Sequence, residues 1–526
     1  MRLDRVFIDG FKNLRNVNAD FDERRLTSVI IGQNGAGKSN FLEAITEVFR
    51  FVDLNRGDLR FRYNIEYRIG DNSVCLANTG SGPVIVANGR ELSRNEFDHN
   101  KSEYFPDLVF GYYSGGSRRF ERLFDTHQRR YYDAIKLNND PEKCRTALRD
   151  RRLFFCRPIH GVFALMSFFA FPDLGVLRLL RSRLGITGFH SALALFREPW
   201  FFNEGRKASL RDAPDLWGSE GPAGQCGRAL RDVAFHPLVL EDRPIDDYRD
   251  KGGSEVQLAA FLRDTDVLNK LAMSYRDDRE MFAALEAADI SDLFRELYLW
   301  ITRDGDSSGD VSFADLSDGE RQLLMVLGLI RISRGQRALF LLDEPDTHLN
   351  PVWQHTYLNL IREWTGIVAE EANCHIVMTS HNPLTISALL KDEVRVMFPD
   401  SSGISVVAPY VDPRGMGFTA TLTEIFGLPT TLDSATQELV DQRNELAQLV
   451  HRSADQERQL VEINEKLNRL GFLFEDREPL YQDFLRAWHN VQYADRPVLS
   501  PEQLQQSQAA MQAVIRELTS NRGSEP

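Results

Sequence analysis

The stretch Gly32-Gln33-Asn34-Gly35-Ala36-Gly37-Lys38-Ser39 decides the fold of this chain. It has the spacing of a phosphate-binding loop, with a lysine and a serine at its end. An apolar, β-branched run at 27–31 precedes it. A helical pattern follows, with one apolar face made of Phe41, Leu42, Ile45 and Phe49. We therefore predict a strand, a loop and a helix in this order, which is the context that the motif needs.

The residue types explain how this loop would hold a triphosphate. Its glycines allow backbone angles that turn successive amide hydrogens inward around the phosphates. Lys38 would pair with the β- and γ-phosphates, and the hydroxyl of Ser39 would bind Mg²⁺. The positive end of the following helix adds to the attraction. We predict ATP and Mg²⁺ as cofactors, and a nucleotide site that includes Gly32, Asn34, Gly35, Gly37, Lys38 and Ser39.

Two acidic residues follow a second predicted strand. The run at 338–342 is apolar throughout, as in a parallel strand that is covered on both faces. It would deliver Asp343 and Glu344 to the carboxyl edge of the sheet, where open α/β sheets bind ligands. We predict that Asp343 holds Mg²⁺ together with Ser39. Glu344 is then the candidate general base, or polariser, of the attacking water.

A third buried strand, at 376–380, ends at His381. The imidazole would lie at the same sheet edge, where it could sense the γ-phosphate or orient the water. Cys374 and His375 stand at the start of this strand. The other cysteines are far away in the sequence, so we do not expect a metal site there.

The segment Leu316-Ser317-Asp318-Gly319-Glu320-Arg321-Gln322 resembles the signature motif of ABC-type ATPases. Ser317 and the amides near Gly319 are predicted to open a helix, which gives a second terminus able to receive phosphate. The resemblance implies that this terminus faces the phosphate loop of a second copy, so that two chains close on ATP. Across that interface, the expected nucleotide contacts are Ser317, Gly319, Glu320 and Asn350.

Within that superfamily, the chain resembles the SMC, RecF and OLD branch. The resemblance is carried by the strand at 5–8 with Gly10-Phe11-Lys12-Asn13-Leu14 after it, and by the segment 343–351. Asn350 stands where that branch usually has an aspartate. The resemblance implies an α/β fold, in which an ABC-type ATPase head combines a mixed sheet with an antiparallel subdomain.

We divide the chain into four regions. Residues 1–125 form the first half of the head, with the phosphate loop and an antiparallel sheet, and residues 306–417 form the second half. Between them, 126–305 reads as a large helical insertion without sustained heptads. The polar region 418–526 is predicted to be helical, with two antiparallel helices joined near 451–455, and to be the docking surface for partners.

Composition limits the environment and the partners. A net charge of −14 argues against coating nucleic acid by bulk electrostatics. Five cysteines without paired spacing, and the absence of a predicted secretory leader, favour a cytoplasmic location. The most apolar stretch, 161–171, is shorter than the roughly twenty residues that cross a bilayer. We therefore expect no contact with a membrane.

One basic region could still contact DNA. Between Arg118 and Arg157 there are twelve basic and six acidic residues, which leaves an excess of six positive charges. A solvated helical face, or a surface paired with acids, explains such a region at least as well as DNA binding. Both interpretations stay open at this point. The phenylalanines of the insertion are expected in its core rather than in a base-stacking platform.

The overall layout resembles PtuA-like ATPases of Septu-type and retron-associated anti-phage systems. Softer signals are the segments 110–116, 415–417 and 470–472, and no Asp-x-Asp pair of a TOPRIM nuclease follows His381. The resemblance implies a regulatory ATPase that assembles with itself and with a separate PtuB-like HNH endonuclease. A retron reverse transcriptase and its msDNA are further implied partners. The alternatives are a RecF-like or SMC-like repair ATPase on DNA ends or gaps, and an ABC subunit coupled to a transporter.

Overall fold

A computed structural model describes residues 1–80, 82–136, 138–199, 212–244, 253–365, 373–401, 403–449 and 452–471. The chain divides into two compact units, Met1–Pro429 and Thr430–Pro526. The first unit holds every residue that the sequence assigns to the nucleotide site. The predicted divisions at 126 and 306 fall inside it, so the head and its insertion form one compact body.

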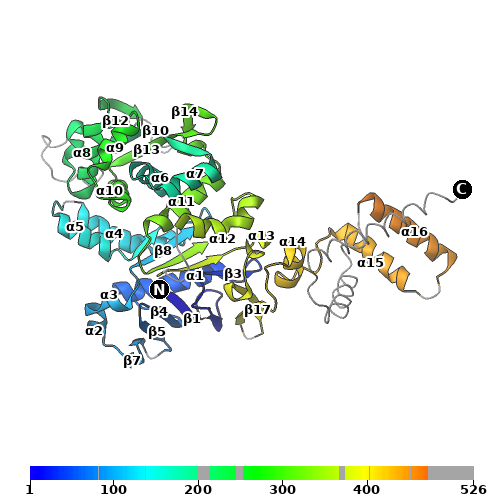
Figure 1. Cartoon of the computed structure of the whole chain (residues 1–526). Coiled ribbons are helices and arrows are strands. Elements are labelled where there is room, and N and C mark those ends of the chain that lie inside the picture. The colour runs from blue at the N-terminus through cyan, green and yellow to red at the C-terminus, as the bar shows by residue number, and fades with distance from the viewer. Residues whose placement is uncertain are drawn as a thin grey trace, which may run out of the picture. The chain divides into compact units, whose positions relative to one another are not determined.

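A seven-stranded sheet forms the centre of the first unit (Figure 1). Its members, in spatial order, are β18 (Gly403–Val407), β17 (Val394–Asp400), β3 (Thr27–Gly32), β16 (His375–Thr379), β15 (Ala338–Asp343), β8 (Leu108–Tyr113) and β9 (Leu153–Phe155). All neighbours are parallel except β17 and β18. The three strands predicted as buried, β3, β15 and β16, are buried along their whole length.

An antiparallel sheet and the helix after the phosphate loop cover one face. The six strands are, in spatial order, β2 (Val17–Asp20), β1 (Arg2–Asp9), β4 (Arg62–Ile69), β5 (Asn72–Asn78), β6 (Pro83–Ala87) and β7 (Arg90–Glu91). The apolar side of α1 (Lys38–Leu54) shares one core with both sheets, to which Phe41, Ile65 and Leu341 all belong. This confirms the predicted strand, loop and helix. The short helices α2 (Arg94–His99) and α3 (Lys101–Tyr104) follow β7.

Helices cover the other face of the central sheet. The apolar faces of α6 (Ile159–Ala170) and α11 (Asp318–Ile332) share a core with Phe340 and Met378. Phe163, Phe168 and Phe169 are buried there, as expected for core phenylalanines. Other helices of this unit are α4 (Asp125–Ile135), α5 (Pro141–Asp150), α7 (Leu174–Leu184), α8 (Gly221–Val233), α9 (Thr265–Ala272), α10 (Asp278–Ile290), α12 (Pro351–Thr365), α13 (Pro383–Ile386) and α14 (Gly417–Ala420).

The insertion differs from the helical lobe that the sequence predicts, because it supplies four strands of a five-stranded antiparallel sheet, and the fifth strand follows it at 306–312. The strands are, in spatial order, β11 (Leu238–Pro244), β12 (Ser254–Leu262), β10 (Ile186–Arg197), β13 (Phe294–Arg303) and β14 (Asp306–Ser312). Alanine and leucine in β10 favour helix locally, but Ala192, Ala194 and Phe196 point into the core. Strand pairing and burial therefore override local propensity here.

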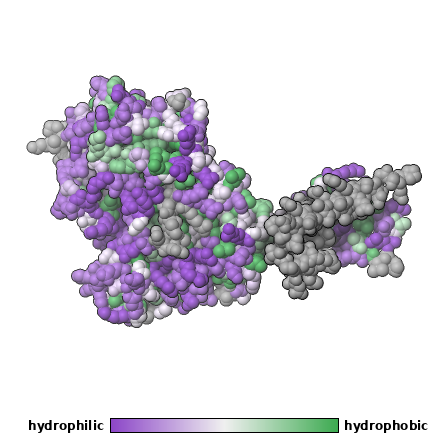
Figure 2. All heavy atoms as spheres, in the orientation of Figure 1, coloured by the Kyte–Doolittle hydropathy of each residue, from purple (hydrophilic) through white to green (hydrophobic). Residues whose placement is uncertain are grey.

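The opposite face of this sheet is partly apolar and meets solvent. Phe261 and Tyr298 both stand opposite Leu193 of β10, and both are more than a third exposed. Figure 2 shows an apolar area on this lobe, with hydrophilic surface around it. Among the described residues, this face therefore leaves Phe261 and Tyr298 partly open to solvent.

The second unit contains the predicted pair of helices, α15 (Ser434–Gln448) and α16 (Ala454–Arg469). They share a small core around Ile463 and Leu467. Asp433 and Ser453 cap the two helices through their side chains. The rest of the predicted docking region, after Gly471, lies outside the described residues.

Candidate functional site

The phosphate loop leaves β3 and enters α1 through positions that exclude side chains. A Cβ on Gly32 would lie 2.1 Å from the carbonyl oxygen of Met397, which is backbone and cannot yield. Gly37 has a φ of 98°, and a Cβ there would meet Leu14 at 2.8 Å. Gly35 also has a positive φ, whereas the side chain of Asn34 is exposed. The loop therefore follows the path that the glycine spacing predicts.

Lys38 is buried at the start of α1. Its ammonium group donates to the carbonyl oxygens of Gly32, at 2.8 Å, and Gln33, at 3.1 Å. Burial lowers the pKa of Lys38, while the nearby charges of Glu344 and Asp343 raise it. The ammonium thus lies inside the loop, facing the end of the strand that carries the two acids.

The hydroxyl of Ser39 donates to Asp343 at 3.0 Å, although the two residues are 304 positions apart. The hydroxyl of Thr379 donates to the same carboxylate oxygen at 2.6 Å. Asp343 is buried, and burial raises the pKa of its carboxyl group. Hydroxyl and carboxylate oxygens are the ligands that Mg²⁺ prefers, so Ser39 and Asp343 fit the predicted metal site. Thr379 is not among the site residues that the sequence motifs predict.

Glu344 has an unusual backbone conformation, with a φ of 54°. Its amide donates to the hydroxyl of Thr379 at 3.0 Å, which fixes the turn. Left-handed backbone at a residue with a Cβ costs on the order of 1–3 kcal/mol, and such strain gathers at functional sites. The turn lifts the Glu344 carboxylate away from β15 and toward His381.

His381 Nε2 lies 2.7 Å from Glu344 Oε1, within hydrogen-bond distance. The hydrogen bond from His381 holds the pKa of Glu344 below its ordinary value. Glu344 is therefore ionised and able to accept a proton from water. Because His381 contacts Glu344 directly, its geometry fits a role in orienting this carboxylate.

The signature segment opens α11 as predicted. Ser317 is the N-cap, and its side chain accepts from the amide of Glu320. The Glu320 carboxylate turns back to the amide and hydroxyl of Ser317, at 2.8 Å each, and also pairs with Arg303 at 2.7 Å. Glu320 is thus engaged in holding the helix terminus. In the described residues, no hydrogen bond or ion pair joins 317–320 to the phosphate loop.

The loop between β15 and α12 packs against this terminus. A Cβ on Gly319 would lie 2.6 Å from the carbonyl oxygen of His348. The amide of His348 donates to Gln322 Oε1 at 3.3 Å. Asn350 accepts from the amide of Trp353 at 2.9 Å, so its side chain caps α12. The buried carboxylate of Asp346 accepts from Ser380 and Thr385, at 2.6 Å each.

Two residues beside the phosphate loop, Asn13 and Arg119, were not predicted as site residues from the sequence. Asn13 donates to the carbonyl oxygen of Gly35 at 3.0 Å. Arg119 pairs with Glu43 of α1 at 3.0 Å. The signal for Asn13 was its place in the segment after the first strand. Arg119 was visible only as one of many charges in the basic region.

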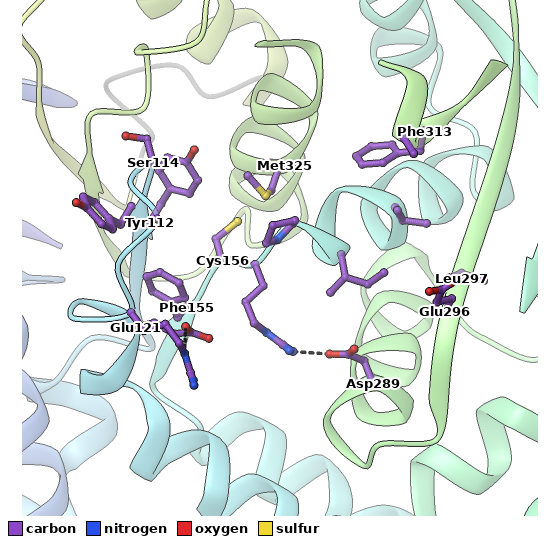
Figure 3. Close-up of a pocket in the computed structure, with 18 of the residues that line it drawn as sticks. Tyr112, Ser114, Glu121, Phe155, Cys156, Asp289, Glu296, Leu297, Phe313 and Met325 are labelled. Atoms are coloured by element: carbon purple, nitrogen blue, oxygen red, sulfur yellow. Dashed lines mark hydrogen bonds and ion pairs between the residues drawn. The ribbon is translucent and has the colours of Figure 1, made fainter. Parts of the chain in front are cut away.

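One cleft of the first unit is separate from this site. It measures about 760 Å³, and none of residues 32–39 or 343–344 lines it. Figure 3 shows Tyr112 and Ser114 at the end of β8 on one side, and Phe313 and Leu297 on the other. The cleft therefore separates the segment after β8 from the strands that lead to the signature.

Most charges of the basic region have acidic partners. Arg118 pairs with Glu121, and Arg129 pairs with Asp133. The fully buried Arg151 pairs with Glu286 at 2.7 Å, inside the insertion. These pairs favour the interpretation as a neutralised surface and an internal contact over one continuous DNA-binding face.

Helices long and apolar enough to cross a membrane are absent from the described residues. The same part of the chain contains no cluster of three or more His, Cys, Asp or Glu side chains fit to hold a metal ion. His375 is a core residue, since its Nδ1 accepts from the amide of Leu3 and its Nε2 faces the hydroxyl of Ser28, both at 3.0 Å.

Two protein-family models match parts of the chain. One, described as "AAA ATPase domain", matches residues 1–100. The other, described as "AAA domain, putative AbiEii toxin, Type IV TA system", matches residues 240–387. The first contains the phosphate loop, and the second contains the signature, both acids and His381. These two segments are therefore similar to ATPase domains.

Solved structures of similar ATPase heads have low identity to the chain. The SMC head domain from Thermotoga maritima is 13% identical, with 78% of this chain and 100% of that chain covered and a TM-score of 0.32. An Smc head domain with an extended coiled coil, bound to the C-terminal domain of ScpA and derived from Pyrococcus furiosus, is 13% identical over 77% and 96%, with a TM-score of 0.33. The recombination mediator RecF with ATP is 15% identical over 72% and 92%, with a TM-score of 0.26.

Proposed function

We propose that this chain is the ATP-binding and ATP-hydrolysing regulatory subunit of a bacterial anti-phage defence complex. The observation that carries the ATPase part is the convergence of five side chains at one edge of the central sheet. These side chains are Lys38, Ser39, Asp343, Glu344 and His381. They come from three parallel strands and their following segments, which is where open α/β sheets place ligands.

Each residue then has a defined task. Lys38 and the amides of the loop bind the phosphates, while Ser39 and Asp343 would hold Mg²⁺, which would supply neutralising positive charge to the phosphates when bound. Glu344 accepts a proton as the water oxygen bonds to the γ-phosphorus. The bond from that phosphorus to the bridging oxygen of ADP breaks. His381 keeps Glu344 ionised and oriented through the hydrogen bond that it donates.

The signature helix would complete the site on a second copy. The first amides of α11 would offer donors to a phosphate, and the Ser317 hydroxyl would join them by exchanging Glu320 for the phosphate. Asn350 lies in the loop that packs against this terminus. Two copies would then enclose ATP between the loop of one and the signature of the other. ATP would change the arrangement of the heads through its differential affinity for the closed state, so rapid turnover is not required.

The second unit is the proposed docking surface for a separate, PtuB-like HNH endonuclease. Val461 on α16, and Leu449 and Leu470 just after the ends of α15 and α16, are more than a third exposed. A pair of helices with so small a core is typically stabilised by further packing. A retron reverse transcriptase with its msDNA would bind the same assembly.

Three measurements test the proposal. Purified chain should hydrolyse ATP with Mg²⁺ and shift from monomer to dimer on ATP addition, measured by light scattering. Lys38→Ala should raise the Kd for ATP at least about 10-fold, because it removes a buried phosphate partner worth more than about 1.4 kcal/mol. Coexpression with a PtuB-like nuclease should yield a stable complex. A chain that stays monomeric and ignores Mg²⁺ and ATP would refute the proposal.

The RecF-like alternative predicts different behaviour. Salt-dependent and ATP-dependent DNA binding by the isolated chain would support it. The ion pairs within 118–157 leave Arg122, Arg130 and Arg149 as exposed cations outside any ion pair among the described residues. A triple alanine variant at these positions should leave ATP binding unchanged, and it should abolish DNA binding only if this alternative is correct.

A further inference from the structure

Arg119 lies beside the nucleotide site, on the segment that follows β8. The amide of Ser114, at the start of this segment, donates to the carbonyl oxygen of Asp343 at 3.2 Å. The segment therefore begins directly against the strand that carries the metal site. It then reaches α1, where Arg119 Nε lies 3.0 Å from Oε1 of Glu43.

Glu43 explains why Arg119 is brought there. It stands four residues after Ser39 on α1, so both side chains project from the same face of the helix. Its side chain is only 4% exposed. Lys12, from the segment after β1, pairs with the other carboxylate oxygen. One buried carboxylate thus gathers two cations from distant segments, which leaves a net positive charge beside the phosphate loop.

The contact with Glu43 holds Arg119 at this place but occupies only part of its guanidinium group. Among the described residues, Oε1 of Glu43 has no aligned hydrogen-bond donor, so the contact with Arg119 is ionic. The Arg119 side chain is 44% exposed, and its guanidinium lies 5.6 Å from the ring centre of Tyr113. A guanidinium has five N–H donors, and most of them remain able to bind another anion.

The positive charge of Arg119 also acts on Asp343 of the predicted metal site. Its charge is one of the influences that lower the pKa of Asp343, against the dominant effect of burial. Lys38 supplies one cation to the phosphates from inside the loop. Phosphoryl transfer spreads charge over the three outer oxygens of the γ-phosphate, and a second cation from the solvent side would stabilise that charge.

We infer that Arg119 is a catalytic residue that binds the γ-phosphate of ATP in the same chain, and that Glu43 is the positioning residue that presents it. This inference rests on the proposed ATPase function. Arg119 forms charge-assisted hydrogen bonds to the transferring phosphate oxygens and takes no proton. Glu43 contacts neither nucleotide nor metal, and acts through Arg119.

The experiment compares Arg119→Ala and Arg119→Gln with Arg122→Ala, which removes an exposed cation three residues away. Single-turnover hydrolysis and the Kd for Mg²⁺-ATP are measured for each. Both Arg119 variants should hydrolyse ATP at least about 100-fold more slowly, since arginines in this role contribute about 10³–10⁵ in rate. Their Kd should change less than about threefold. Arg122→Ala should match the parent chain in both measurements.

Chemical rescue separates catalysis from a structural role. Millimolar guanidinium should restore part of the rate of Arg119→Ala and none of that of Lys38→Ala. Arg119→Lys should recover part of the rate, because it returns a charge without the planar fork. Glu43→Gln should lower the rate about 10-fold at unchanged Kd, without rescue by guanidinium, because its arginine is present but misplaced.

Two results overturn the inference. In the first, Arg119→Ala and Arg119→Gln hydrolyse ATP like the parent chain. In the second, both lose activity and melting temperature together, and guanidinium restores nothing. If the parent chain hydrolyses ATP in these cases, the proposed ATPase function is retained and only the role of Arg119 is refuted. If the parent chain neither binds nor hydrolyses ATP, the ATPase function and the role of Arg119 are both refuted.

Discussion

Asp343 and Glu344 are neighbours with opposite electrostatic environments. Burial raises the pKa of Asp343, whereas the hydrogen bond from His381 lowers that of Glu344. When the environment separates the pKa values of two neighbouring acids, the two often have different chemical roles in a site. Here the buried acid is suited to a metal ion, which would replace its proton, and the ionised acid is suited to accept a proton.

Glu344→Gln should stop hydrolysis while ATP stays bound. The amide keeps the shape of the side chain but cannot take a proton from water, so we expect a rate loss of at least about 100-fold. Light scattering should find the variant as an ATP-stabilised dimer. If Glu344→Gln released ADP and phosphate as fast as the parent chain, its assignment as the base would be wrong.

The raised pKa of Asp343 predicts a link between pH and Mg²⁺. Its carboxyl group stays protonated up to a higher pH than an ordinary aspartate, and only the carboxylate binds metal. ATPase activity should therefore fall on acidification before ordinary carboxylates titrate. Raising the Mg²⁺ concentration about 10-fold should move this acid limb downward by up to about one pH unit, because metal and proton compete. Rate profiles at two Mg²⁺ concentrations measure the effect, and identical profiles would contradict it.

At the scale of elements, the start of α11 and the loop before α12 behave as one piece. Gly319 lies against the carbonyl of His348, and Gln322 holds the amide of that residue. Asn350 caps α12 at the other end of the loop. The two segments expected at a dimer interface therefore support each other within one chain.

Gly319→Ala should separate nucleotide binding from dimer closure. The added Cβ would lie 2.6 Å from a backbone oxygen, so the helix terminus and the loop must move apart. We expect the Kd for ATP to stay within about threefold, and ATP-dependent dimerisation to weaken at least about 10-fold, or about 1.4 kcal/mol. Gly116→Ala is the control, since its Cβ meets nothing within 4 Å. Sedimentation with ATP distinguishes the two, and equal dimerisation would refute the coupling.

At the scale of the whole molecule, buried histidines make the free energy of unfolding depend on pH. Burial lowers the pKa of His375 from 6.5 to about 3, and lowers that of His160 well below its ordinary value. Both are neutral in the folded chain. The unfolded chain binds protons at these positions below about pH 6.5, so their contribution to stability is full above this pH and is lost as pH falls toward about 3.

Between pH 7.5 and 5.5, His375 should account for a loss of about 1.4 kcal/mol in the free energy of unfolding. His375→Asn should be less stable at pH 7.5 because it disturbs the contacts to Leu3 and Ser28. Between pH 7.5 and 5.5, the free energy of unfolding of this variant should fall by about 1.4 kcal/mol less than that of the parent chain. Urea unfolding at both pH values measures the difference. The control, His99→Gln, changes an exposed histidine and should follow the parent chain.

Removal of the second unit should leave the ATPase intact. The two units have separate cores, so a chain that ends at Pro429 should keep its Kd for ATP within about threefold. On the proposed function, it should no longer copurify with the nuclease. Copurification of the truncated chain at an unchanged level would place the docking surface on the first unit.

Local motifs were sufficient to predict much of the site. The phosphate loop, the acids after β15 and the N-cap of α11 each depend on residues within one short segment, so spacing and residue type identify them. The sheet of the insertion was missed because its alanine and leucine runs favour helix locally. Its strands form through pairing between segments far apart in sequence, such as β10 with β13.

The sequence by itself determined that the phosphate loop, the two acids and His381 each follow a buried strand, because hydrophobic runs and glycine spacing are local properties. Only the tertiary structure decided which side chains meet them. Thr379 bonds to Asp343, and Arg119 reaches Glu43, because parallel strands bring their carboxyl ends to one edge regardless of their separation along the chain. Such contacts depend on strand order and on the path of the connecting segments, which no short stretch of residues encodes.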